Sequence, residues 1–188
     1  MNHHTANLTL AHVAAVRAAA RRRQATTPFP LVAFGLVNLG GVPACALVGR
    51  YHLAPYAIPA FALAVWLSAR AVRRRARTEG VQLSVRPWAL TAAALCIGGA
   101  GTSHAGNLLD IDVLSAVGPF LAQAAGIWLL ARWADSHALI AASIVMVLGS
   151  ATIGSLASGD LAVALQFSLY GALLLATGYH AASLTPRT

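Results

Sequence analysis

Five polar side chains lie within or beside long apolar segments of this 188-residue chain, where a solute could bind to them. They are Asn38, His104, Asn107, Gln123 and Gln166. If Asn38, Gln123 and Gln166 converge, they form a polar stripe suited to a neutral or polar solute. The alternative is that each side chain hydrogen-bonds a neighbouring helix. The apolar segments contain no carboxylate, which disfavours transport coupled to protons or sodium.

Four histidines offer a second chemistry, because neutral imidazole is a good axial ligand for haem iron. His52 and His104 fall near one end of the apolar segments, and His137 and His180 fall near the other. Two such pairs could hold two b-type haems across a helical bundle, an arrangement that resembles the six-helix cytochromes b. Histidines at a membrane interface often bind nothing, so the favoured expectation is that no cofactor is present.

A metal site is the third hypothesis. Imidazole and carboxylate ligands suit zinc or another divalent ion. The candidate ligands fall toward one end of the apolar segments and are His52, His104, Asp110, Asp112 and Asp160. Their spacing in the sequence does not bring them together, so the alternative is a set of solvated loop residues.

The composition indicates a membrane protein. Hydrophobic residues make up 58% of the chain, charged residues make up 10%, and the mean hydropathy is +0.68. A soluble domain carries about 25% charged residues. A chain with so little charge cannot cover a water-facing surface, which excludes an ordinary soluble enzyme, a disordered protein and a disulfide scaffold.

Six apolar segments are each close to the roughly 20 residues that cross a bilayer as a helix. They span residues 28–49, 53–69, 87–107, 113–131, 138–158 and 161–181. The sequence therefore predicts an all-α bundle of six transmembrane helices in one domain, residues 28–183. We expect residues 1–27 to form a cytoplasmic tail with a short amphipathic helix at the membrane surface, and residues 184–188 to form a second cytoplasmic tail.

Two of these segments are expected to be irregular. Pro55 and Pro59 predict a disturbed start for the second segment. Gly98, Gly99 and Gly101 fill the second half of the third segment. This half could be unwound along a cavity, as broken helices are in transporters.

Arginines set the predicted orientation. All thirteen basic residues are arginine. With the N-terminus inside, alternating loops place twelve of them in the cytoplasm and Arg50 alone outside, as the positive-inside rule requires. Alanine is abundant and lysine is absent, which indicates a bacterial gene. We therefore expect a multi-pass protein of the bacterial cytoplasmic membrane with both termini in the cytoplasm.

The net charge of +8 fits this topology rather than nucleic-acid binding, because the arginines lie between apolar segments. Arginines beside a span contact the anionic headgroups of the lipid bilayer. We expect such contacts at Arg21, Arg22, Arg23, Arg73, Arg74, Arg75 and Arg77. The same arginine-rich face could instead bind a cytoplasmic protein.

Small residues recur every four positions in the last four segments. A four-residue step keeps them on one helix face, where they let two backbones approach closely in lipid. The rows are Ala94, Gly98, Thr102 and Gly106, then Gly118, Ala122 and Gly126, then Ser150, Gly154 and Ser158, then Ala164, Ser168, Ala172 and Ala176. These rows predict a compact bundle or a homo-oligomer.

The first third of the chain carries a family resemblance. The first apolar segment is preceded and opened by TPFP (residues 27–30), and the second is followed by RRRARTEGV (residues 73–81). This region resembles small six-span actinobacterial membrane proteins that have no assigned activity. The resemblance implies neither a substrate nor a catalytic residue.

The expected architecture favours a small permease-like or accessory transport subunit for an unidentified solute. The alternatives are a non-catalytic membrane scaffold or sensor with a cytoplasmic partner, and a bis-histidine haem redox protein. A role that is not enzymatic is favoured. A cavity in the bundle would favour transport, a solid apolar interior would favour a scaffold, and facing histidines would favour redox chemistry.

Replacing Arg73, Arg74, Arg75 and Arg77 together by glutamate should disturb the orientation of the chain, because arginine retains a loop in the cytoplasm. Reporter fusions at the C-terminus and in the 108–112 loop measure the orientation. If both reporters keep their sidedness, the assigned topology is wrong.

Overall fold

The computed structural model describes residues 12–13, 15–16, 28–79 and 91–183, and the regular elements in these ranges are all helical. Five helices are long: α2 (Pro28–Val48), α3 (Ala54–Glu79), α6 (Asp112–Ala134), α7 (His137–Leu156) and α8 (Gly159–Ser183). A short 3₁₀ helix, η1 (Arg50–His52), joins α2 to α3. A π-helical turn, η2 (Ala94–Gly98), leads directly into α5 (Gly99–Leu108).

The five long helices are also long and apolar enough to cross a membrane. They coincide with five of the six apolar segments, which confirms the all-helical class and supports a membrane protein. The third predicted segment is described only from Thr91 onward, as a helical run to Leu108. The count of six spans therefore stays a prediction.

The second segment differs from its prediction at both ends. We expected the helix to end near Ala69, but α3 continues through the arginines to Glu79, since arginine and alanine are both good helix formers. We expected an irregular start, but α3 is helical from Ala54. Pro55 falls in the first turn, where a missing N–H leaves no hydrogen bond unmade.

The glycine-rich third segment is not unwound either. Gly99 and Gly101 lie within α5, and the irregularity is the preceding π-helical turn, η2. A π-helical turn is a local widening of the helix that is often found at functional sites.

Some predictions fall outside the described residues. Of the expected N-terminal helix, only His12, Val13, Ala15 and Val16 are described, and all four are helical and exposed. Arg21, Arg22 and Arg23, the segment 80–90 and the tail 184–188 lie outside the description, as does the side chain of Arg75.

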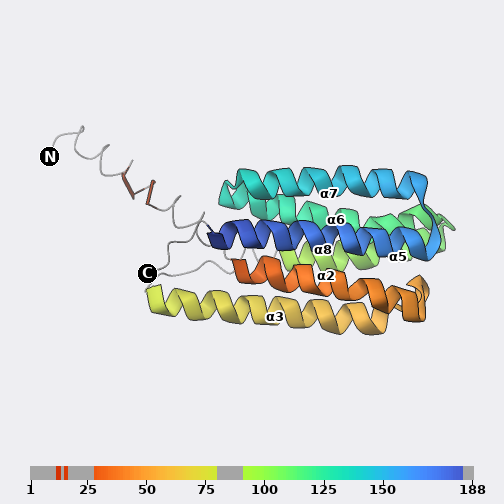
Figure 1. The fold of residues 1–188 in the computed structure, drawn as a ribbon, viewed down its shortest axis with the longest axis horizontal. Helices are drawn as coiled ribbons and strands as arrows, with labels where there is room; N and C mark the ends of the chain where they lie inside the picture. The colour runs from red at the N-terminus through yellow and green to blue at the C-terminus, as the bar shows by residue number, and fades with distance from the viewer. Residues whose placement is uncertain (1–11, 14, 17–27, 80–90, 184–188) are drawn as a thin grey trace.

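The long helices lie side by side along a common axis (Figure 1). α2 and α8 form the most extensive contact, and α6 packs against α5 and η2 on one side and against α7 on another. α3 lies at an edge, where it packs against α2 and makes no comparable contact with α5, α6 or α8 in the described ranges. The bundle therefore encloses its other helices more completely than α3.

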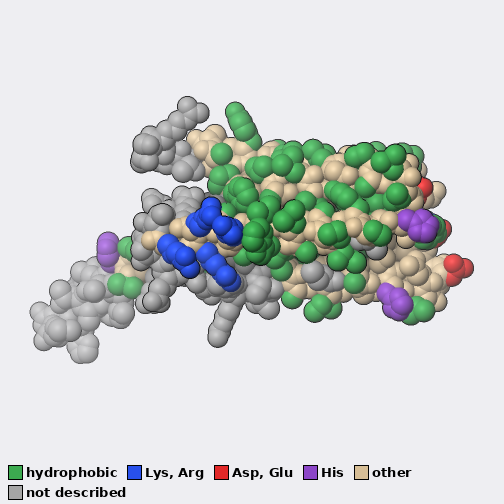
Figure 2. Space-filling model, turned by 90° about the horizontal axis from the view of Figure 1, so that it is seen from below, with side chains coloured by type: hydrophobic (Ala, Val, Ile, Leu, Met, Phe, Trp, Pro, Cys, Tyr) green, Lys and Arg blue, Asp and Glu red, His purple; other side chains and the backbone are tan. Residues whose placement is uncertain are grey.

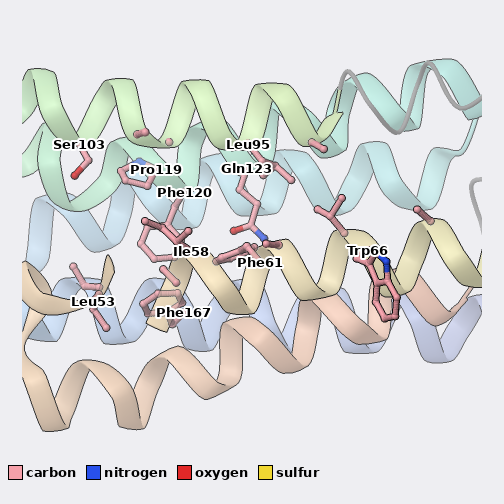
Figure 3. Close-up of a pocket in the computed structure, with 18 of the residues that line it drawn as sticks. Leu53, Ile58, Phe61, Trp66, Leu95, Ser103, Pro119, Phe120, Gln123 and Phe167 are labelled. Carbon is pink, nitrogen blue, oxygen red and sulfur yellow. The ribbon is translucent and has the colours of Figure 1, made fainter. Parts of the chain in front are cut away.

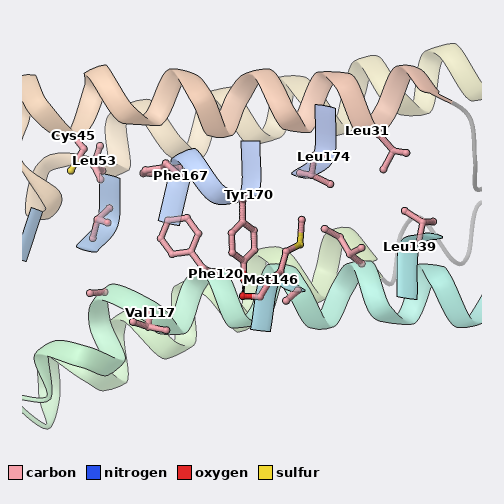
Figure 4. Packing of buried hydrophobic residues seen from close by; sticks show 14 of the residues in the cluster. Leu31, Cys45, Leu53, Val117, Phe120, Leu139, Met146, Phe167, Tyr170 and Leu174 are labelled. Carbon is pink, nitrogen blue, oxygen red and sulfur yellow. Dashed lines mark hydrogen bonds between the residues drawn. The ribbon is translucent and has the colours of Figure 1, made fainter. Parts of the chain in front are cut away.

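The core is aromatic at its centre (Figure 4). The ring of Phe120 on α6 meets Phe167 and Tyr170 on α8 edge to face, with centroid distances of 4.9 and 5.3 Å. Such pairs stabilise a protein by about 0.5–1.5 kcal/mol each beyond burial. Met146 of α7 is fully buried beside Tyr170, so this cluster joins α6, α7 and α8.

The predicted rows of small residues in α5 and α6 do face one another. A Cβ on Gly98 would lie 2.9 Å from Cβ of Ala122, and a Cβ on Gly118 would lie 2.6 Å from Cβ of Thr102. Gly106 contacts the backbone of Ser115 still more closely. Because the helices are antiparallel, one row fits against the other, and the predicted close packing of these two segments is confirmed.

The contact of the last helix with α2 is made through glycines outside the predicted row of small residues, so the role of that row stays a prediction. Ala172 and Ala176 are exposed, whereas α8 packs against α2 through Gly171 and Gly178. A Cβ on Gly171 would lie 2.6 Å from the Leu39 side chain. The contact needs the closest possible backbone approach, and glycine allows a closer approach than alanine.

Charge is sorted between the two ends of the bundle (Figure 2). One end holds an arginine cluster on α3, made of Arg70, Arg73, Arg74 and Arg77, and we call it the arginine end. The opposite end, the acidic end, holds Asp112, Asp160 and Arg50. Apolar side chains cover the surface between them. This sorting is what the alternating assignment of loops predicted for these residues.

Replacing Gly106 by alanine should destabilise the bundle by about 1–3 kcal/mol, because the new Cβ would collide with the Ser115 backbone. Gly101→Ala is the matched control on the same helix, since nothing lies within 4 Å of its Cβ and alanine favours a helix by up to about 1 kcal/mol. Thermal unfolding in detergent measures both. A Gly106→Ala variant as stable as the wild type would contradict the close α5–α6 packing.

Candidate functional site

An elongated groove of about 1420 Å³ separates α3 from η2, α5 and α6 (Figure 3). Phe120 of α6 and Val163 and Phe167 of α8 also line it. The lining side chains Ile58 and Trp66 are largely exposed, so the groove is open to the surroundings of the bundle. Its volume exceeds the roughly 300–1000 Å³ of an ordinary small-molecule pocket.

One face of α3 forms a continuous wall of this groove. Its apolar part recurs at helical spacing and consists of Ala57, Ile58, Phe61, Ala62, Val65, Trp66 and Ala69. The arginine cluster continues the same face for two further turns, and all four arginines line the groove. The wall therefore changes from apolar to cationic along a single helix.

The arginine cluster is exposed, and no carboxylate of the described residues forms an ion pair with it. The Arg70 guanidinium lies 5.4 Å from the ring centre of Trp66, a cation–π contact that joins the cationic and apolar parts of the wall. The positive charge of this end of the groove is thus left uncompensated by the described part of the chain.

The other end of the groove is lined by Arg50 and Tyr51, which belong to a network that we call the Arg50 clasp. The Arg50 backbone N–H donates to a carboxylate oxygen of Asp160 at 2.9 Å, and the guanidinium donates to Asp112 at 2.9 Å. The guanidinium also donates to the Tyr51 hydroxyl and lies 4.5 Å from its ring centre. The clasp ties the α2–α3 turn to the first residues of α6 and α8.

The clasp keeps Arg50 charged. Its burial alone would lower the pKa, but the hydrogen bond to Tyr51 and the negative charge of Asp112 raise the pKa of Arg50 above its ordinary value. Arg50 is therefore already committed to partners of the chain, unlike the arginine cluster.

Gln123 is the polar side chain at mid-groove. It projects from α6 toward Phe61 on α3 (Figure 3), is only 4% exposed, and its Nε2 has no hydrogen-bond partner among the described residues. An unpaired buried amide costs about 1–3 kcal/mol. A ligand oxygen in the groove would satisfy it.

The other path candidates are placed at different interfaces. Asn107 is exposed and lines the groove near the acidic end, whereas His104 is exposed and does not line it. Asn38 is buried on α2, where its Nδ2 donates to the Phe34 carbonyl at 2.8 Å, and it does not line the groove. The groove thus brings together Gln123 and Asn107 of the five candidates.

Gln166 belongs to a buried network between α7 and α8. The Ser150 hydroxyl donates to Oε1 of Gln166 at 2.7 Å and lies 2.9 Å from the Tyr170 hydroxyl. Nε2 of Gln166 donates back to the Ser150 carbonyl at 3.3 Å. All three residues are fully buried, so this glutamine has the helix-joining role that was the alternative for each candidate.

The histidines and acids are distributed over both ends. His52 and His104 lie toward the acidic end and His137 and His180 toward the arginine end, and all four side chains are exposed. No three histidine, cysteine, aspartate or glutamate side chains in the described ranges form a group that could hold a metal ion. Asp112 and Asp160 instead converge on Arg50. Asp110, two residues before Asp112, is exposed.

Two features of the site were missed by sequence reasoning. We expected the arginines of the cluster to lie in a loop after Ala69. Their spacing in the sequence, however, continues the helical face that runs from Ala57 to Ala69. The pairing of Arg50 with Asp112 and Asp160 was also missed. The sequence did contain a signal for it, because Arg50 is the one arginine expected on the same side of the membrane as these two aspartates.

Comparison with family models, curated proteins and solved structures finds no match for this chain. The resemblance of residues 27–81 to actinobacterial membrane proteins therefore stays a prediction.

Replacing Ser150 by alanine should destabilise the protein by about 1 kcal/mol, because it leaves Gln166 and Tyr170 without a shared partner. Ser155→Ala is the control, since Ser155 is exposed on the same helix and bonds only its own helix at Thr152. Thermal unfolding in detergent compares the two. Equal stability of both variants would reject a structural role for the network.

Proposed function

We propose that this protein is a small permease-like membrane protein, acting alone or as a transport subunit, that takes an amphiphilic solute into the groove beside α3. The observation that supports this most directly is the volume of about 1420 Å³ between α3 and the α5–α6 pair. It lies among helices that are apolar enough to cross a membrane. A solute with an apolar body could enter it from the bilayer.

The chemistry of the walls supports an amphiphile over a small polar solute. Phe61, Val65 and Phe167 present apolar surface, which favours burial of hydrocarbon by about 25 cal/mol per Å². Gln123 supplies one polar contact in the middle and the arginine cluster supplies charge at one end. A solute with hydrocarbon chains and a polar group matches this order.

The groove also favours transport over the scaffold and haem alternatives. A scaffold was expected to have a solid interior, and a haem protein was expected to have histidines facing one another. We further propose that the bundle has six spans and lies in the bacterial cytoplasmic membrane with the arginine end inside, because arginine is retained on that side.

Proteoliposomes that contain the protein should move a fluorescent phosphatidylcholine between leaflets several-fold faster than protein-free liposomes. Dithionite bleaching of the outer-leaflet probe measures this rate. Ala62→Phe should return the rate toward the protein-free value, because Ala62 lines the groove and the larger side chain fills it.

Leu63→Phe is the matched control, since Leu63 is the next residue, is 55% exposed and does not line the groove. It should keep the wild-type rate. A wild-type rate no higher than that of protein-free liposomes, or equal inhibition by both substitutions, would count against transport through the groove.

A further inference from the structure

We infer that the groove is a binding site for one anionic phospholipid, whose acyl chains lie along the apolar part of α3 and whose phosphate binds the arginine cluster. This assignment rests on the proposed function, because it names the class of amphiphile that the groove admits. Four observations carry it: the length of the apolar wall, the positive charge at the end of that wall, the unpaired amide of Gln123 in the groove and the position of Trp66.

The apolar wall has the length of one bilayer leaflet. It runs along α3 from Ala57 to Ala69, which at 1.5 Å per residue is about 18 Å. Half of a hydrocarbon core is about 15 Å. The first arginine of the cluster follows at Arg70, which is the depth at which a lipid headgroup begins.

The charge at this position selects an anion. The four arginines line the groove, and none of the described residues that line it is acidic. A guanidinium presents a planar set of N–H donors that matches two phosphate oxygens at once. In contrast, Arg50 at the other end is bound by Asp112 and Asp160, so among the described arginines of the groove it is the cluster that offers free guanidinium donors to a ligand.

Two further contacts fit a lipid. Trp66 lies at the boundary between the apolar and cationic parts, beside Arg70, and tryptophan favours the level of the headgroups. Deeper in the groove, Nε2 of Gln123 has no partner among the described residues and projects toward α3. The ester carbonyls of a lipid are acceptors for such a donor.

A second copy of the chain fits the groove less well. A symmetric partner that offered the same face would place its own arginine cluster against this one. Like charges at such a contact repel one another, and none of the described residues that line the groove is a carboxylate that could compensate them.

Brominated lipids test the site, because bromine quenches tryptophan fluorescence at short range. The chain has four tryptophans, and Trp88→Phe, Trp128→Phe and Trp133→Phe leave Trp66 as the reporter. The protein is reconstituted in vesicles with increasing fractions of brominated phosphatidylglycerol or brominated phosphatidylcholine. We expect half-maximal quenching at a fraction of phosphatidylglycerol about tenfold lower than that of phosphatidylcholine.

The double substitution Arg73→Gln and Arg74→Gln should reduce this preference at least fivefold. Each arginine near an anionic headgroup increases the affinity for the lipid by about fivefold. Arg132→Gln is the matched control, because Arg132 lies in the last turn of α6, is exposed and is not among the described residues that line the groove. It should leave the preference within twofold of the wild type. Glutamine is used rather than glutamate so that the orientation, verified by reporter fusions, is preserved.

Equal quenching by the two lipids in the wild type would overturn the assignment, and so would an equal loss of preference in the control. Quenching that depends on protein dilution rather than lipid charge would indicate a second copy in the groove. Transport of phosphatidylcholine without any preference for phosphatidylglycerol would keep the proposed function and reject the anionic lipid. A preference without transport would keep the lipid site and reject the permease.

Discussion

Close approach of helix backbones at glycine is the interaction on which the rest of the structure depends. In lipid, apolar side chains gain little by leaving the solvent, so helices associate through packing and hydrogen bonds. Gly171 and Gly178 bring α8 against α2, and Gly106 and Gly118 bring α5 against α6. α3 contains no glycine. In the described ranges its most extensive contact is with α2, and the groove lies on the side of α3 that faces η2, α5 and α6.

The helix positions could be predicted because they depend on runs of apolar residues, which the sequence displays directly. α2, α6, α7 and α8 begin and end within about three residues of their predicted limits. The extension of α3 could not be predicted by hydropathy, since a helix continues into the arginines for reasons of backbone propensity. The contact of α8 with α2 through Gly171 and Gly178 was not predicted, because alanine and glycine were given equal weight as small residues.

The site was harder to predict than the fold, because it depends on distances between helices. Gln166 and Gln123 are the same residue type in neighbouring helices, yet Ser150 satisfies one and nothing described satisfies Nε2 of the other. Sequence alone gives no measure of that difference. Likewise Arg50 and Arg73 are both arginines at the end of a span, but two aspartates bind only Arg50.

The Arg50 clasp has a mechanical consequence for α3. The helix is held at its acidic end by hydrogen bonds and an ion pair, and further along by Tyr56, whose hydroxyl donates to the Val37 carbonyl at 2.6 Å. Its last turns extend past the first residue of α2 (Figure 1). In the described ranges α3 is therefore tied to the rest of the bundle by polar contacts at its acidic end, and Ser68 and Val72 are its last buried side chains toward the arginine end. Moving the start of α3 away from α6 would break these hydrogen bonds, whereas none of the hydrogen bonds or ion pairs described beyond Val72 holds α3 to another helix, so the described polar contacts set the width of the groove from its acidic end.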